Sequence, residues 1–263
     1  MYNFEFTKPT TVAEAAKAMS DEGAQALGGG QTLLPTMKQR LAMPETLVSL
    51  TGVDGMVGVD ARDGKIVIGG ATTHAQVAAD VAKSYPALAA LADNIGDPAV
   101  RNRGTIGGSL ANNDPAACYP AGALASGATI TTNTRDIHAD DYFQGMFETA
   151  LREDEIITSV SFPMVEKGNY QKFNQPASRF ALVGVFVAVT ADGVRVAVTG
   201  ASNGGVYRWT EAETALNSDF SAGAIEGMTG DDSNMITDLH GSAAYRAHLV
   251  GVLTRRAVTA CSS

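Results

Sequence analysis

The sequence predicts an α+β protein built from more than one unit, and three observations support this. Short β-prone runs of residues are interleaved with alanine- and leucine-rich runs of helical spacing. Asp63-Gly64 and Asp192-Gly193 each separate two β-prone runs, which is the pattern of a hairpin. The chain has 263 residues, of which 45% are hydrophobic, so it can bury the cores of two ordinary domains or of one large domain.

The first 52 residues predict a compact unit of strands and helices. Thr11 and Glu14 have the spacing of a capping box, and the alanines that follow continue a helix. A second helix follows a glycine turn, because Leu33, Leu34, Met37 and Leu41 recur at helical spacing. The strands of this unit are expected at residues 3–7, 25–28 and 47–50.

A second unit is expected from residue 53 to residue 167. It opens with the Asp63-Gly64 hairpin, and a loop rich in Gly, Asn, Asp and Arg at 96–113 is long for a plain connection. Loops of that composition are often binding loops. Helices are expected at 72–83, 86–95 and 115–126, and strands at 56–59, 65–68, 129–132, 136–138 and 155–162.

The polar segment 168–179 reads as a linker to a small α+β domain. That domain holds strands at 182–190 and 194–200 and a final helix from Ser242. The sequence therefore predicts one domain at 1–167, with subdomains at about 1–52 and 53–167, and a second domain at 168–263.

Composition and charge argue against several classes of function. The net charge is −9 and the basic residues are scattered, so nucleic acid is not expected as a partner. No apolar run approaches the ~18 residues of a membrane helix, so no membrane insertion is expected. The first ten residues do not resemble a secretory signal, and cysteine is rare, which together predict a cytoplasmic protein.

The cysteines and histidines predict no metal site in this chain. Cys118 and Cys261 are far apart and lack a second ligand at metal spacing, so they cannot hold an iron-sulfur cluster or a structural zinc ion. The four histidines form no ligand motif and are expected to be ordinary surface or capping residues.

The segment Gly28-Gly29-Gly30-Gln31-Thr32 is the first candidate site. It lies between a strand and a helix, where small residues let backbone N–H groups face an anion such as a dinucleotide pyrophosphate. The alternative is that three glycines form only a tight turn. Leu33 stands where the third glycine of a Rossmann motif would be, so a conventional Rossmann site is not favoured.

The second candidate loop runs from Arg101 to Pro115. It combines close backbone approach at Gly104, Gly107 and Gly108 with hydroxyl groups at Thr105 and Ser109. Two glycine-rich loops in one chain suggest that both bind the same long cofactor, one that contains a diphosphate.

These residues resemble the flavoprotein subunits and domains of the molybdenum hydroxylases, the family that includes carbon monoxide dehydrogenase and xanthine dehydrogenase. The likeness lies in the runs 28–35 and 100–110, which match the two FAD-binding signatures of that family in order and separation. It continues through 141–151, 180–183 and 242–246, and so spans nearly the whole chain.

The resemblance implies a two-subdomain FAD-binding domain of the PCMH (vanillyl-alcohol oxidase-like) type, followed by a small C-terminal domain. Leu151 would offer backbone contacts to the flavin ring, and Phe180 would lie against it. Cys118 stands where the family usually has an acidic side chain that bonds to the cofactor, which puts that contact in doubt. The implied cofactor-binding residues are Gly28, Gly29, Gly30, Gln31, Thr32, Thr105, Gly107, Gly108, Ser109, Cys118, Leu151 and Phe180.

By the same resemblance, the chain is an electron-transfer subunit that binds FAD noncovalently and has no catalytic residues of its own. Electrons would come from [2Fe-2S] clusters in a small subunit, and substrate would react at the molybdenum cofactor of a large subunit, in a dimer of heterotrimers. Two alternatives remain open. Cys118 or His74 could anchor a flavin covalently in a self-contained oxidase, and the plain glycine turn would suit a non-catalytic nucleotide-binding or assembly module.

Overall fold

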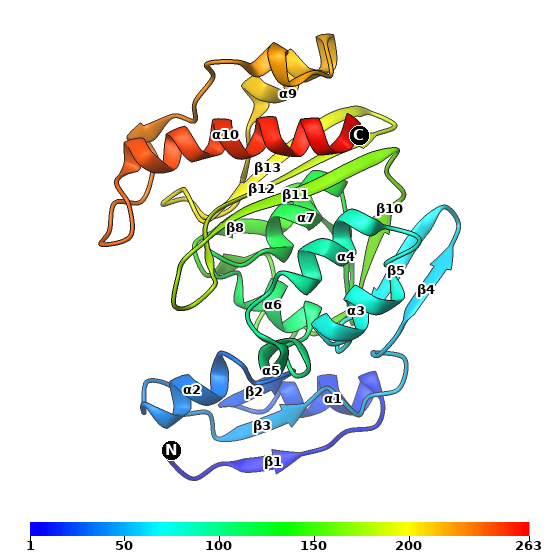
Figure 1. The fold of residues 1–263 in the computed structure, drawn as a ribbon. Helices are drawn as coiled ribbons and strands as arrows, with labels where there is room; N and C mark the ends of the chain where they lie inside the picture. The colour runs from blue at the N-terminus through cyan, green and yellow to red at the C-terminus, as the bar shows by residue number, and fades with distance from the viewer. Residues whose placement is uncertain (263) are drawn as a thin grey trace.

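The computed structural model describes residues 1–262 and shows a mixed α+β fold (Figure 1). The first unit is a three-stranded parallel sheet in the order β1-β3-β2, with two helices. Thr11 and Glu14 form the predicted capping box at the start of the first helix. The elements are β1 (Glu5–Thr7), α1 (Val12–Met19), β2 (Ala24–Leu27), α2 (Leu33–Lys38) and β3 (Thr46–Ser49).

The second helix is shorter than the sequence predicted. It ends at Lys38 because Arg40 adopts a left-handed backbone with φ of 62°, which stops the helical turn. Leu41, expected on the apolar face of this helix, is 76% exposed.

The second unit is a five-stranded antiparallel sheet in the order β4-β5-β10-β6-β7, packed against short helices. The strands are β4 (Val59–Arg62), β5 (Lys65–Gly69), β6 (Thr129–Thr132), β7 (Asp136–His138) and β10 (Ile157–Pro163). A small hairpin, β8 (Phe143–Gly145) and β9 (Glu148–Thr149), follows helix α8 (Ala139–Tyr142). The other helices are α3 (His74–Asp80), α4 (Pro86–Asp93), α5 (Pro98–Arg101), α6 (Ile106–Asn112) and α7 (Tyr119–Ser126).

Two predictions for this unit were wrong in detail. The first strand of the hairpin lies at 59–62 and not at 56–59, because Asp63 and Gly64 both have positive φ and form a two-residue turn that pairs Arg62 directly with Lys65. The segment 96–113, expected as a loop, contains α5 and α6. Asp97 caps the first of these helices and Thr105 caps the second.

The C-terminal unit is an antiparallel sheet in the order β11-β12-β13-β14. Helices α9 and α10 pack on one face of the sheet, and α4 and α7 pack on the other (Figure 1). The elements are β11 (Lys167–Asn174), β12 (Ala181–Thr190), β13 (Gly193–Thr199), β14 (Tyr207–Arg208), α9 (Thr210–Ser218) and α10 (Ala243–Ser262), with short 3-10 helices at Ala222–Ile225 and Asp232–Asn234.

The prediction of a linker at 168–179 was wrong, because residues 167–174 form β11. This strand pairs with β12 alone, so it is an edge strand, and among its residues only Tyr170 is buried. An edge strand carries polar residues that an inner strand would exclude, and its composition therefore resembles that of a linker.

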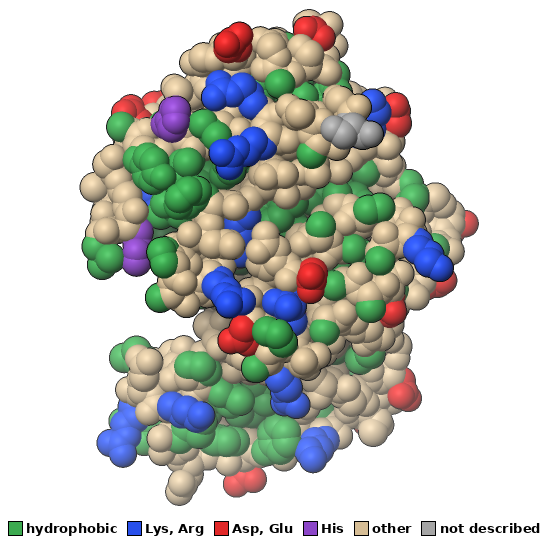
Figure 2. Space-filling model, in the orientation of Figure 1, with side chains coloured by type: hydrophobic (Ala, Val, Ile, Leu, Met, Phe, Trp, Pro, Cys, Tyr) green, Lys and Arg blue, Asp and Glu red, His purple; other side chains and the backbone are tan. Residues whose placement is uncertain are grey.

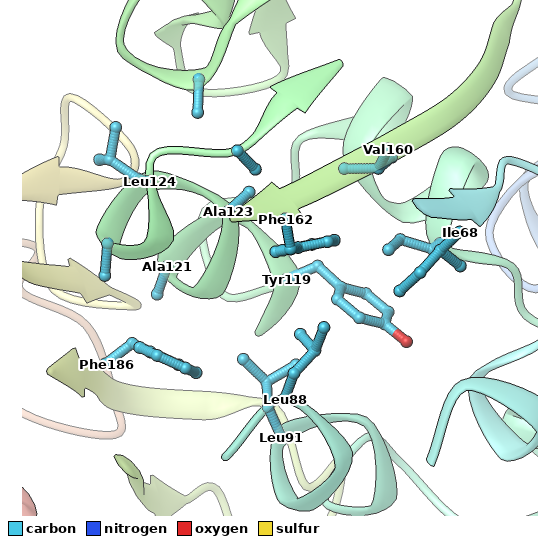
Figure 3. Packing of buried hydrophobic residues seen from close by; sticks show 14 of the residues in the cluster. Ile68, Leu88, Leu91, Tyr119, Ala121, Ala123, Leu124, Val160, Phe162 and Phe186 are labelled. Atoms are coloured by element: carbon cyan, nitrogen blue, oxygen red, sulfur yellow. The ribbon is translucent and has the colours of Figure 1, made fainter. Parts of the chain in front are cut away.

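The central core joins the second and third units. Figure 3 shows the Tyr119 ring among Leu88, Leu91 and Phe162, and it shows Phe186 of the C-terminal sheet near Ala121 in the same cluster. Every residue of α7 is buried, which explains why its sequence has no polar face. The second unit and the C-terminal unit therefore share one hydrophobic core and are not separate domains joined only by a linker.

Candidate functional site

The candidate site is a cavity of about 660 Å³ between the first unit and the rest of the chain. Figure 2 shows the molecule hollowed between its lower part, which holds residues 1–52, and the part above. The volume is within the usual range for cofactor sites. All twelve predicted cofactor-binding residues line this cavity: Gly28, Gly29, Gly30, Gln31, Thr32, Thr105, Gly107, Gly108, Ser109, Cys118, Leu151 and Phe180.

The first loop, residues 28–32, presents free backbone donors at the cavity. Gly30 has a φ of +70°, which turns the chain from β2 toward α2. Among residues 1–262 we find no acceptor for the N–H groups of Gly29 to Thr32, and Thr32 makes no side-chain cap. Unpaired N–H groups at a glycine turn suit a negatively charged ligand.

The second loop, residues 101–115, contributes differently. The first N–H groups of α6 are already used, since Ile106 donates to the Thr72 carbonyl at 3.1 Å and Gly107 to the Gly70 carbonyl at 2.9 Å. Gly108 donates to Thr105 Oγ1 at 3.2 Å. This loop therefore offers shape and hydroxyl groups to a ligand, and the free amides come from the first loop.

The glycines of the two loops have different roles. A Cβ at Gly29 would overlap the backbone of Arg103, and a Cβ at Gly107 would lie 2.5 Å from the Gly70 carbonyl oxygen. A Cβ at Gly108 would meet only Thr105 Oγ1, at 3.0 Å. Gly29 and Gly107 thus allow the backbones to pack, whereas Gly108 faces open space at the cavity.

His74 lines the cavity as well, and the sequence prediction of an ordinary surface or capping residue is wrong for it. The side chain is buried beside Tyr119, with 5.3 Å between ring centroids, and Nδ1 has no hydrogen-bond partner in the described part of the chain. Burial, assisted by the nearby Arg101, lowers the pKa of His74 to about 4, so the imidazole is neutral at pH 7. Of the other histidines, His138 caps α8.

The acidic groups on the cavity wall differ in their environment. Glu155 accepts hydrogen bonds from Arg135 at 2.7 Å and 2.9 Å, and this guanidinium holds the pKa of the carboxyl well below its usual range. Burial raises the pKa of Asp114. Glu155 is therefore an ionised group already engaged by protein partners.

The cavity also has apolar lining residues, among them Cys118, Leu151 and Phe180, which are together called the apolar wall. Cys118 is buried, whereas Phe180 is 45% exposed. The Leu151 N–H donates to Thr149 Oγ1 at 3.3 Å, which leaves its carbonyl as the backbone group for a ligand. The cavity thus combines a loop with unpaired backbone amides and apolar lining residues, which are the features that a dinucleotide with a planar ring system requires.

Comparisons with known proteins indicate the family. Residues 2–165 match the family model "FAD binding domain in molybdopterin dehydrogenase". The chain is 37% identical to the nicotine 6-hydroxylase medium subunit of Paenarthrobacter nicotinovorans, over 96% of this chain and 95% of that one. It is 32% identical to the carbon monoxide dehydrogenase medium chain of Afipia carboxidovorans, over 97% of this chain and 96% of that one.

The fold is also similar to solved structures. A chain of reconstituted CO dehydrogenase from Oligotropha carboxidovorans superposes with a TM-score of 0.91 at 28% identity, covering 99% of this chain and 98% of that one. A chain of quinoline 2-oxidoreductase from Pseudomonas putida 86 superposes with a TM-score of 0.88 at 26% identity, covering 99% and 97% of the two chains.

Proposed function

The chain belongs to the family of FAD-binding medium subunits of molybdenum hydroxylases, and we propose that it carries FAD in a heteromeric complex of this kind. Electrons enter from [2Fe-2S] clusters of a small subunit and leave to an external acceptor. Substrate reacts at the molybdenum cofactor of a large subunit. The observation that carries the proposal is one cavity lined by both glycine-rich loops and by an apolar wall.

The residues present fit FAD. The N–H groups of Gly29 to Thr32 without acceptors suit the diphosphate, and the open face of Gly108 leaves room for it. Thr105 and Ser109 would border the diphosphate and the ribityl chain, while Leu151 and Phe180 would border the flavin ring. Bound FAD supplies reversible acceptance of electrons, and the protein groups bind and orient it.

The finer assignments belong to the same proposal. FAD is held noncovalently, the first two units form a PCMH-type domain at 1–167 and residues 168–263 form the C-terminal domain. The complex is a cytoplasmic dimer of heterotrimers. In the described range 1–262, no helix combines the length and apolarity needed to cross a membrane.

A self-contained flavin oxidase is the second candidate function, because Cys118 and His74 both line the cavity. These are the residue types that can attach a flavin covalently. Acid treatment separates the two candidates, since a noncovalent cofactor leaves the precipitated protein and a covalent one stays with it.

The test begins with titration of the purified full chain with FAD. We expect one FAD per chain, released intact by acid. Gly108→Val should abolish binding and keep the far-UV circular dichroism of the wild type, because the branched side chain fills the space beside the diphosphate. Gly52→Val is the matched control, since a Cβ at Gly52 meets nothing within 4 Å and the residue lies outside the cavity lining.

Stopped-flow absorbance then tests the electron path. The flavin of the isolated chain should not be reduced by organic substrates, and it should be reduced rapidly once the iron-sulfur and molybdenum subunits are added. Rapid reduction of the isolated chain by an organic substrate would establish the self-contained oxidase. Release of FMN in place of FAD would contradict both candidate functions.

A further inference from the structure

Phe147 has a backbone conformation that its residue type disfavours. It is the second of two residues, Met146 and Phe147, at the tip of the β8-β9 hairpin, and its φ is 58°. A bulky residue in this left-handed region is an outlier, and a turn with positive φ at its second central position favours glycine or asparagine. Such outliers persist only where surrounding structure holds them, often at functional sites.

Asn113 holds the hairpin tip in place. Its side-chain Nδ2 donates to the carbonyls of Gly145 at 2.8 Å and Glu148 at 2.9 Å, and its own carbonyl accepts from the Phe147 N–H at 3.0 Å. Asn113 is buried and directly follows α6, the helix that carries the second cofactor loop. The conformation of Phe147 is therefore fixed relative to that loop by three hydrogen bonds.

The side-chain ring of Phe147 is not part of the hydrophobic core. Phe147 is 58% exposed and lines the cavity, together with Leu151 and Phe180. Its ring packs against no other aromatic ring in residues 1–262. Met146, its neighbour at the tip, is 39% exposed and does not line the cavity.

The left-handed backbone of Phe147 costs free energy, and its exposed ring contributes no core packing that would offset this cost. A ligand that packs against the ring would offset it. We propose that Phe147 is a cofactor-contacting residue that packs against the isoalloxazine ring of bound FAD. This inference rests on the proposed function and adds a residue to the twelve that the sequence analysis predicted at the cofactor. The isoalloxazine is the partner because Phe147 lies four residues before Leu151, at the tip of the hairpin that leads to it, while the free amides of residues 29–32 suit the diphosphate.

The test compares Phe147→Asn with Met146→Ala in the full chain. Asparagine tolerates positive φ, so the variant removes the ring without adding backbone strain. We expect the Kd for FAD to rise by about tenfold, in the range of an aromatic contact, and the visible absorption band of the bound flavin to shift because water replaces the apolar ring. The melting temperature of the protein without FAD should stay unchanged or rise. Met146→Ala should match the wild type in all three measurements.

Phe147→Tyr should restore the affinity and the flavin absorption band to near the wild-type values. Wild-type affinity and a wild-type flavin absorption band in Phe147→Asn would overturn the role of Phe147 and leave the proposed function intact. A weaker Kd for ADP with an unchanged flavin absorption band would place Phe147 at the adenine and also overturn the inference. Failure of the wild-type chain to bind FAD would overturn the proposed function together with it.

Discussion

At the residue scale, His74 gives the protein a pH-dependent stability. Its pKa is lowered from 6.5 to about 4 in the folded protein because the imidazole is buried. The unfolded chain therefore binds the proton first when the pH falls. The stability linked to this group is complete above pH 6.5 and is lost as the pH falls through 4.

We predict that His74 accounts for about 3 kcal/mol of the stability lost between pH 6.5 and pH 4, since each pKa unit corresponds to ~1.4 kcal/mol. His74→Asn removes the titrating group and should flatten the dependence in this window. Urea unfolding at several pH values measures it for both proteins. Equal slopes for the wild type and the variant would contradict this role.

The sequence identified many residues of the candidate site but not all. The glycine loops have recognisable spacing, and the twelve residues predicted from them and from the family resemblance line one cavity. His74 and Phe147 reach the same cavity from α3 and from the hairpin tip. The sequence analysis placed His74 at a flavin only in the alternative of a covalent attachment, and it gave Phe147 no role within the run 141–151. The burial of His74 and the positive φ of Phe147 arise from packing between distant segments. A residue's own neighbours in sequence cannot reveal either property.

At the element scale, a buried arginine adds polar contacts to the apolar packing of α10 on the C-terminal sheet. Arg246 is 1% exposed and donates to the carbonyls of Leu182 at 2.6 Å and Gly200 at 2.7 Å. Its other terminal nitrogen bonds both carboxylate oxygens of Asp238 at 2.8 Å. The planar guanidinium reaches β12, the residue that follows β13 and the loop at Asp238 at once, which an ammonium group cannot do.

Arg246→Lys should therefore lower the free energy of unfolding by about 3 kcal/mol, because carbonyls and a carboxylate lose buried partners. Arg256→Lys on the same helix is the matched control, since Arg256 is exposed. Chemical denaturation at pH 7 gives both values. Equal stability of the two variants would show that the buried bonds contribute little.

Elements with local signals were predicted well, and elements that depend on partners were not. The capping box of α1 and the strands β6, β7, β12 and β13 lie close to where the sequence indicated. Strand β11 was missed because its polar residues are acceptable only at an edge, and α6 because its glycines suggest a loop. Gly107 is tolerated in that helix because α6 packs directly on the backbone at Gly70.

At the scale of the whole molecule, the C-terminal sheet has two buried faces. Val183, Val185 and Val187 of β12 face α9 and α10, whereas Phe186 and Ala188 join the core around α4 and α7. The sequence alternation of β12 could not show this, because nearly every residue in it is apolar. The predicted division into domains at 1–167 and 168–263 follows the family resemblance of the sequence. It does not separate two independent cores, because β12 contributes side chains to both.

We predict that residues 167–263, expressed alone, do not form a native fold, because the removal of α4 and α7 exposes one face of the sheet. The fragment should lack near-UV circular dichroism and a cooperative thermal transition. Co-expression with residues 1–166 should restore both. A cooperative transition of the isolated fragment near the melting temperature of the full chain would contradict the shared core.

The backbone contact between the two glycine loops bears on how the family signatures are interpreted. Glycine at positions 29 and 107 is imposed by folding, since any side chain there would strike Arg103 or Gly70, with or without a ligand. Glycine at position 108 has no such constraint from the protein backbone. A related protein that had lost its cofactor would therefore keep glycine at positions 29 and 107, whereas position 108 could accept other residues. The residue at position 108 is therefore a better indicator of cofactor binding than the presence of the motif.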